Sequence, residues 1–108
     1  MTELINLCIT SEVEEGTPLA VSLSGLPELL VCEFEGEFFV TDNTCTHGNA
    51  KLSEGYQEED EIECPFHGGT FSIRTGEATS FPCVIPIKSY PVTIVDEKVC
   101  ISHAQQPS

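Results

Sequence analysis

Two short motifs near the middle of the chain constrain its fold more than any other feature. They are Cys45-Thr46-His47-Gly48 and Cys64-Pro65-Phe66-His67-Gly68-Gly69, and sixteen residues separate His47 from Cys64. Each motif pairs a thiol with an imidazole beside glycine, which permits tight turns. If the fold brings the two loops together, two thiolates and two imidazoles can surround one metal centre.

These four side chains fit two kinds of metal centre. In a [2Fe–2S] cluster, each iron has two bridging sulfides and takes two protein ligands, so the cysteines can hold one iron and the histidines the other. Such a site is formally neutral when oxidised, which eases electron uptake relative to an all-cysteine site. A structural zinc site also takes sulfur and nitrogen ligands, but its usual spacing groups cysteines with cysteines and histidines with histidines. The spacing favours the cluster.

Short runs rich in Val, Ile, Phe and Thr, separated by turn residues, predict an all-β fold, an antiparallel sandwich or barrel. Glu35-Gly36 and Asp96-Glu97 are predicted hairpin turns, and one helical turn is expected between Glu12 and Gly16. The predicted strands are Leu4–Ile9, Leu19–Leu23, Leu29–Phe34, Glu37–Thr41, Glu61–Glu63, Thr70–Ile73, Ser89–Val95 and Val99–Ser102.

The middle of the chain differs in composition from its ends, being richer in glycine and in reactive side chains. We therefore expect a single domain over residues 1–108, with a cluster-binding subdomain inserted at about residues 43–82. Residues 1–42 and 83–103 would form its base. A length of 108 residues allows one modest core.

Charge and hydropathy exclude several kinds of partner. Four Lys and Arg face 18 Asp and Glu, and the net charge of −14 argues against nucleic acid and anionic membranes. The acidic surface serves either solubility or the steering of partners with basic patches. No run approaches the roughly 20 apolar residues of a membrane-spanning helix. The start, Met1-Thr2-Glu3, lacks signal-peptide features and predicts a cytoplasmic protein.

The six cysteines are then expected to be reduced, as in other cytoplasmic proteins. Cys8, Cys32 and Cys100 lie in predicted strands, where a thiol acts as a small buried hydrophobe. Cys83 follows Pro82, and the sequence assigns it no role.

The pattern C-x-H, sixteen residues, C-x-x-H resembles the Rieske signature. The likeness extends to the ferredoxin components of bacterial aromatic-ring-hydroxylating dioxygenase systems, such as those for naphthalene and biphenyl. It is carried further by Leu52-Ser53-Glu54-Gly55-Tyr56, Ile62-Glu63-Cys64-Pro65, Phe71, Arg74-Thr75-Gly76 and Tyr90-Pro91-Val92.

The resemblance implies the Rieske fold and one [2Fe–2S] cluster per chain. Cys45 and Cys64 would bind one iron, His47 and His67 the other, and Pro82 would lie in a third loop covering the cluster. The implied function is one-electron transfer from a flavin-containing ferredoxin reductase, which oxidises NADH, to a terminal Rieske oxygenase. Both contacts would be transient.

Departures from other Rieske types narrow the function. The disulfide cysteines of respiratory bc-complex proteins correspond to Ala50 and Phe66, and their hydroxyl-bearing serine and tyrosine to Gly69 and Phe71. Since hydrogen bonds to cluster sulfurs raise the potential, their loss predicts a low potential within the Rieske range.

An oxygenase role is excluded by the number of histidines. A mononuclear iron needs two histidines and a carboxylate beyond the cluster, but the chain has three His in all. The chain is therefore predicted to be an electron-transfer component rather than an enzyme. Two alternatives remain at this point: the small Rieske subunit of an assimilatory nitrite reductase, and a zinc-stabilised binding module.

Overall fold

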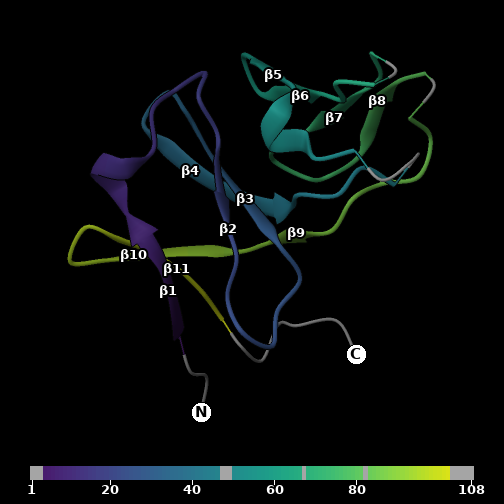
Figure 1. Cartoon of the computed structure of the whole chain (residues 1–108). Helices are drawn as coiled ribbons and strands as arrows, with labels where there is room; N and C mark the ends of the chain where they lie inside the picture. The colour runs from purple at the N-terminus through teal and green to yellow at the C-terminus, as the bar shows by residue number, and fades with distance from the viewer. Residues whose placement is uncertain (1–3, 47–49, 67, 82, 103–108) are drawn as a thin grey trace.

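A computed structural model describes residues 4–46, 50–66, 68–81 and 83–102 of the chain. Its strands form three antiparallel sheets (Figure 1). The first sheet has the order β1–β11–β10, the second β2–β3–β4–β9 and the third β5–β6–β7–β8. The predicted all-β antiparallel fold is confirmed. The bounds are β1 Leu4–Ile9, β2 Leu19–Val21, β3 Leu29–Phe34, β4 Glu37–Asp42, β5 Tyr56–Glu58, β6 Glu61–Glu63, β7 Thr70–Ser72, β8 Ala78–Ser80, β9 Ser89–Tyr90, β10 Val92–Val95 and β11 Lys98–Ser102.

Two-residue turns close the β3–β4 and β10–β11 hairpins as predicted. Glu35 and Gly36 have φ of 54° and 83°, and Asp96 and Glu97 have φ of 50° and 65°. Two consecutive positive φ values are typical of type I′ turns, whose twist matches that of the flanking strands. The residues on either side of each turn are therefore paired across the hairpin, Phe34 with Glu37 and Val95 with Lys98.

The structure differs from the sequence prediction in local detail. The helical turn lies earlier than expected, as a 3-10 helix over Thr10–Glu12, and the Glu12 carboxylate accepts a hydrogen bond from the Ile9 backbone N–H at 2.9 Å. A second 3-10 helix, Leu52–Glu54, was not predicted. Strands β5 and β8 were also missed, since neither shows an alternating apolar pattern.

The central strand β3 separates two buried clusters of apolar side chains. Leu29 and Val31 pack into the cluster between the first and second sheets. Leu30 and Cys32 point the opposite way, into the cluster that contains the core of the β5–β8 sheet. Successive strand residues face opposite sides, so a strand covered on both faces reads as a continuous apolar run.

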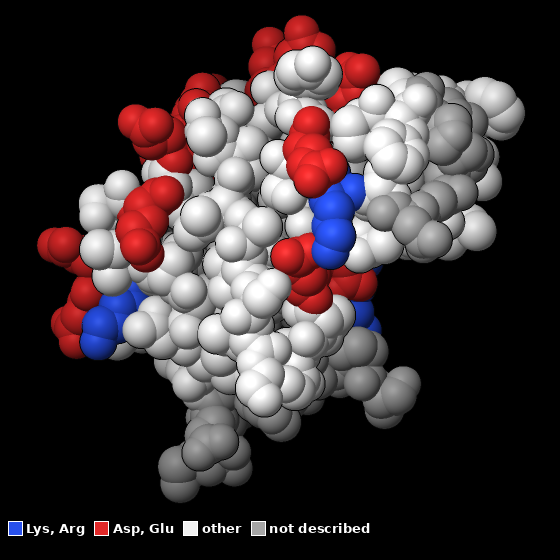
Figure 2. All heavy atoms as spheres, viewed as in Figure 1, with Lys and Arg blue, Asp and Glu red and all other residues white. Residues whose placement is uncertain are grey.

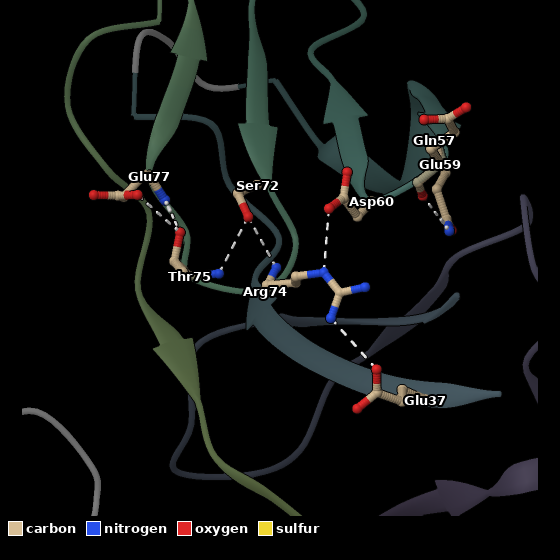
Figure 3. A network of polar contacts seen from close by, with 8 residues as sticks. All are labelled: Glu37, Gln57, Glu59, Asp60, Ser72, Arg74, Thr75 and Glu77. Atoms are coloured by element: carbon tan, nitrogen blue, oxygen red, sulfur yellow. Dashed lines mark hydrogen bonds and ion pairs between the residues drawn. The ribbon is translucent and has the colours of Figure 1, made fainter. Parts of the chain in front are cut away.

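Two polar networks join segments of the fold that are distant in sequence. In the first (Figure 3), Arg74 Nε donates to Asp60 Oδ2 at 3.1 Å and Nη1 donates to Glu37 Oε1 at 3.4 Å. The Arg74 guanidinium also lies over the rings of Phe34 and Phe39, at 5.8 and 5.1 Å from their centroids. The network thus joins the β5–β6 and β7–β8 turns to the β3–β4 hairpin.

The second network surrounds Asn43, which is fully buried. Its Nδ2 donates to Glu28 Oε1 and Ser53 Oγ at 3.1 Å each, and its Oδ1 accepts from the Ser53 N–H at 2.8 Å. Glu28 also pairs with Lys51, and hydrogen bonds from Lys51 and Asn43 lower the pKa of the Glu28 carboxyl. The loop after β4 is thereby fixed at both ends. Within the described part of the chain, no helix is long and apolar enough to cross a membrane.

Candidate metal centre

Cys45 and Cys64 each begin a loop that closes on itself. The Cys45 N–H donates to Ala50 O at 2.9 Å, and the Cys64 N–H donates to Gly69 O at 2.8 Å. In the second loop, the Gly68 N–H also returns to Cys64 O at 3.1 Å. These bonds fix the backbone from which both thiols project.

Both predicted cysteine ligands are buried together. Cys45 and Cys64 are each 1% exposed and belong to one hydrophobic cluster with Leu52, Ile62 and Phe71. No disulfide joins any of the six cysteines, all of which the structure describes. The predicted histidine ligands, His47 and His67, lie outside the described residues, as does Pro82.

A third loop, which follows β8, reaches the same place. Thr46, between the first motif's cysteine and histidine, donates from Oγ1 to Ile85 O at 2.5 Å. The Cys83 N–H donates to Ser80 O at 3.1 Å, and the Cys83 side chain is 3% exposed. Three loops distant in sequence therefore converge on the two buried thiols.

Cys83 is the residue that sequence reasoning left without a role. Burial raises the pKa of its thiol to about 12, with further contributions from charge and a hydrogen bond at Cys45 and from charge at Cys64. Its position next to Pro82 was the only hint in the sequence. Cys8, Cys32 and Cys100 are buried in strands, as predicted.

The donor set suits an iron–sulfur cluster. Two thiols converge in a water-poor, apolar setting, and thiolates are the protein ligands that iron–sulfur clusters prefer. Among the residues that the structure describes, no group of three or more His, Cys, Asp and Glu side chains forms a metal site. Two of the four predicted ligands fall outside that set. Gly69 and the buried Phe71 bring no hydroxyl to the site.

Comparison with known proteins decides the family. Residues 3–91 match the model of the Rieske [2Fe-2S] domain. The chain belongs to the Rieske family. The ferredoxin component of the p-cumate 2,3-dioxygenase system of Pseudomonas putida is 42% identical to this Rieske chain, over 99% of it and 92% of the relative. The corresponding component of the naphthalene 1,2-dioxygenase system of the same species is 48% identical, over 84% and 86%.

Solved structures agree with the sequence comparisons. A ferredoxin of Sphingomonas yanoikuyae B1 is 55% identical, with a TM-score of 0.92 over 97% of this Rieske chain and 100% of its own. A nitrite reductase small subunit from Mycobacterium tuberculosis reaches a TM-score of 0.81 at 14% identity, which shows the fold alone. The ferredoxin components are therefore favoured over that alternative.

Two conclusions follow from membership of the family. The protein carries one [2Fe–2S] cluster, so the alternative prediction of a zinc-stabilised binding module is rejected. Its relatives are electron-transfer ferredoxins rather than catalysts, and this Rieske protein is likewise an electron-transfer component.

Proposed function

We propose that this ferredoxin takes single electrons from a flavin-containing, NADH-oxidising ferredoxin reductase and passes them to the terminal oxygenase of an aromatic-ring-hydroxylating dioxygenase system. The observation that carries the proposal is the near full-length identity to ferredoxin components of such systems. A structure of the carbazole 1,9a-dioxygenase system holds reduced oxygenase with oxidised ferredoxin. The matched chain of that structure aligns with this chain at 36% identity and a TM-score of 0.88, over 97% of this chain and 97% of its own length. A cytoplasmic location accords with six cysteines without disulfides.

The cluster ligands are part of this proposal. Cys45 and Cys64 would hold one iron and His47 and His67 the other, in a subdomain of residues 43–82 supported by residues 1–42 and 83–103. The bound cluster supplies the chemistry, accepting and releasing one electron at a time. The closed loops of the chain hold the two thiols, and the surrounding apolar side chains keep water from them.

The surface around the three loops suits brief contacts with partners. Four large apolar residues there are strongly exposed, and they come from the loops that carry Cys64 and Cys83: Phe66 at 66%, Phe81 at 84%, Val84 at 66% and Ile85 at 60%. We call these four residues the apolar tip. Exposed apolar patches of this kind mark interaction sites, and here the patch adjoins the proposed electron-carrying centre.

Phe81→Asp is expected to slow electron transfer to the oxygenase roughly tenfold, because an aromatic anchor contributes more than about 1.4 kcal/mol to such contacts. The measurement is the oxidation rate of the reduced ferredoxin on mixing with the oxygenase. Ile94→Asp is the matched control, since Ile94 is 47% exposed but lies on β10, away from the tip. Equal rates for the two variants would remove the apolar tip from the docking surface.

Acidic side chains lie on other parts of the surface. On the face shown in Figure 2, red side chains lie at the left, the top and the centre, whereas the described part of the lobe at the right is white. With a net charge of −14, the protein would be steered toward basic partner surfaces by long-range attraction.

We expect the second-order rate of reduction by the reductase to fall about tenfold between low salt and 0.5 M salt, as ions screen this attraction. Stopped-flow mixing at several ionic strengths measures the rate. Rates that do not change with salt would mean that the acidic surface serves solubility alone.

Visible absorption and EPR of the purified protein, before and after dithionite, test the proposed centre. A red-brown protein that bleaches on reduction, with a rhombic signal whose average g lies below the free-electron value, is expected. Reconstitution with NADH, reductase and oxygenase then tests the function, because product should form only when this chain is added. Support of a nitrite reductase large subunit instead would reject the proposed pathway.

A further inference from the structure

The third loop is buried at its ends and exposed in its middle. Cys83 and Ile87 are each 3% exposed, and their N–H groups donate to backbone carbonyl oxygens outside the segment at 3.1 and 2.8 Å. Between them, Val84 and Ile85 of the apolar tip are 66% and 60% exposed. The loop is therefore anchored at both ends and presents its middle to solvent.

One side chain from another loop supports this middle segment, residues 84–86. Thr46 Oγ1 donates to Ile85 O at 2.5 Å, and among the described residues this is the only hydrogen bond that the segment makes. Pro86 has no N–H to donate. A hollow of about 200 Å³ lies between the segment and the start of β8, and it is lined by Glu77, Ala78, Val84 and Pro86. The segment thus depends on Thr46 for its position.

Thr46 itself belongs to the first of the two cluster motifs. It lies between Cys45 and His47, two of the proposed cluster ligands. Its hydrogen bond therefore joins the first ligand loop directly to the apolar tip on the third loop. Thr46 is exposed, so water competes for this bond in the free protein. A partner that covers the tip removes that water, and a hydrogen bond is stronger where the local dielectric is low.

We propose that the Thr46 hydroxyl is a positioning group for partner docking, which holds Val84 and Ile85 in their docking conformation against the first ligand loop. The inference rests on the proposed function, in which the apolar tip contacts the terminal oxygenase. A surface that is already formed loses less conformational entropy when a partner binds. Thr46 therefore affects how tightly the oxygenase binds, and not the rate of electron transfer once the complex has formed.

The test is stopped-flow oxidation of the reduced ferredoxin by increasing concentrations of the oxygenase, which separates the apparent Kd from the limiting rate. Thr46→Val keeps the volume and removes the hydroxyl. We expect its apparent Kd to rise about fivefold, as for the loss of one hydrogen bond, with the limiting rate unchanged. Thr46→Ser keeps the hydroxyl and should return the apparent Kd to the wild-type value. An unchanged Kd in Thr46→Val, or an equal rise in Thr46→Ser, would overturn the proposal.

Thr44→Val is the matched control. Thr44 is an exposed threonine of the same loop. Its backbone pairs with that of Lys51, but its hydroxyl makes no hydrogen bond among the described residues. Its replacement should change neither the apparent Kd nor the limiting rate. An equal rise of the Kd in Thr44→Val and Thr46→Val would mean that the contact with Ile85 has no special part in docking.

A second measurement needs no partner protein. Hydrogen exchange of the isolated holoprotein, followed by mass spectrometry, reports how often residues 83–87 open. Thr46→Val should speed this exchange about fivefold, whereas Thr46→Ser and Thr44→Val should not, and wild-type exchange in Thr46→Val contradicts the inference. Thr46→Ala takes the place of Thr46→Val if the valine variant does not retain the cluster. If the oxygenase fails to oxidise even the wild-type protein, the proposed function fails, while hydrogen exchange still decides whether Thr46 positions the segment.

Discussion

Cys45→Ala is expected to yield a colourless protein that retains less than about a tenth of the wild-type iron, because one iron of the cluster loses half of its protein ligands. Cys64→Ala should have the same effect, since both thiols are proposed to bind the same iron. Iron content per chain, visible absorption and EPR of the reduced protein measure the loss. Because cluster binding contributes to folding, the variants should also unfold at lower temperature.

The control for this result is a cysteine that is buried elsewhere. Cys100 lies on β11, is 5% exposed and has its sulfur 3.7 Å from Lys98 O. Cys100→Ala removes a thiol of similar burial and should keep the colour and the EPR signal. A Cys45→Ala protein with the wild-type spectrum would show that the cluster is held by other residues.

A strand was predicted most accurately where its own sequence shows a clear apolar pattern. Leu29–Phe34 was predicted with its observed bounds because its first four residues are buried on both faces and form an apolar run. Ser89–Val95 was predicted as one strand but is divided at Pro91 into β9 and β10. Proline lacks the N–H that a ladder needs, and at this point the chain passes from the second sheet to the first.

The missed strands depend on their neighbours. The β8 strand, Ala78–Ser80, is an edge strand with weak apolar character and is defined by pairing with β7. The β5 strand forms because the turn at Glu59, with φ of 55°, folds Tyr56–Glu58 back onto β6. Both partner strands, β6 and β7, were predicted from the sequence, but the pairing that defines β5 and β8 was not.

The candidate site likewise has residues that the sequence predicts and residues that it does not. The proposed cysteine ligands were predicted from motif spacing, because coordination chemistry restricts both the residue types and their separation. Cys83 has no motif, and its burial depends on how closely the third loop approaches Gly69. That approach is a property of tertiary packing, which no local pattern encodes.

Gly76→Ala is expected to lower the apparent Tm of the holoprotein by roughly 10–20 °C, corresponding to about 3 kcal/mol for a domain of this size. Gly76 has φ of +83° and a Cβ there would overlap the Ile87 carbonyl oxygen. Its own carbonyl accepts the Ile87 N–H at 2.8 Å. Alanine would therefore meet backbone strain, a steric overlap and a weakened hydrogen bond at once. Loss of visible absorption on heating measures the change.

Gly36→Ala is the control that distinguishes the steric overlap with Ile87 from the strain of the left-handed backbone. Gly36 has the same φ of +83° but nothing lies within 4 Å of its Cβ position, so its cost is that of the left-handed backbone alone, about 1 kcal/mol. Ile87 is buried in the cluster that holds Cys45, Cys64 and Cys83. Its displacement in Gly76→Ala should therefore loosen the third loop and speed cluster release, whereas Gly36→Ala should not. Equal losses in the two variants would mean that Ile87 does not hold the third loop against the cluster site.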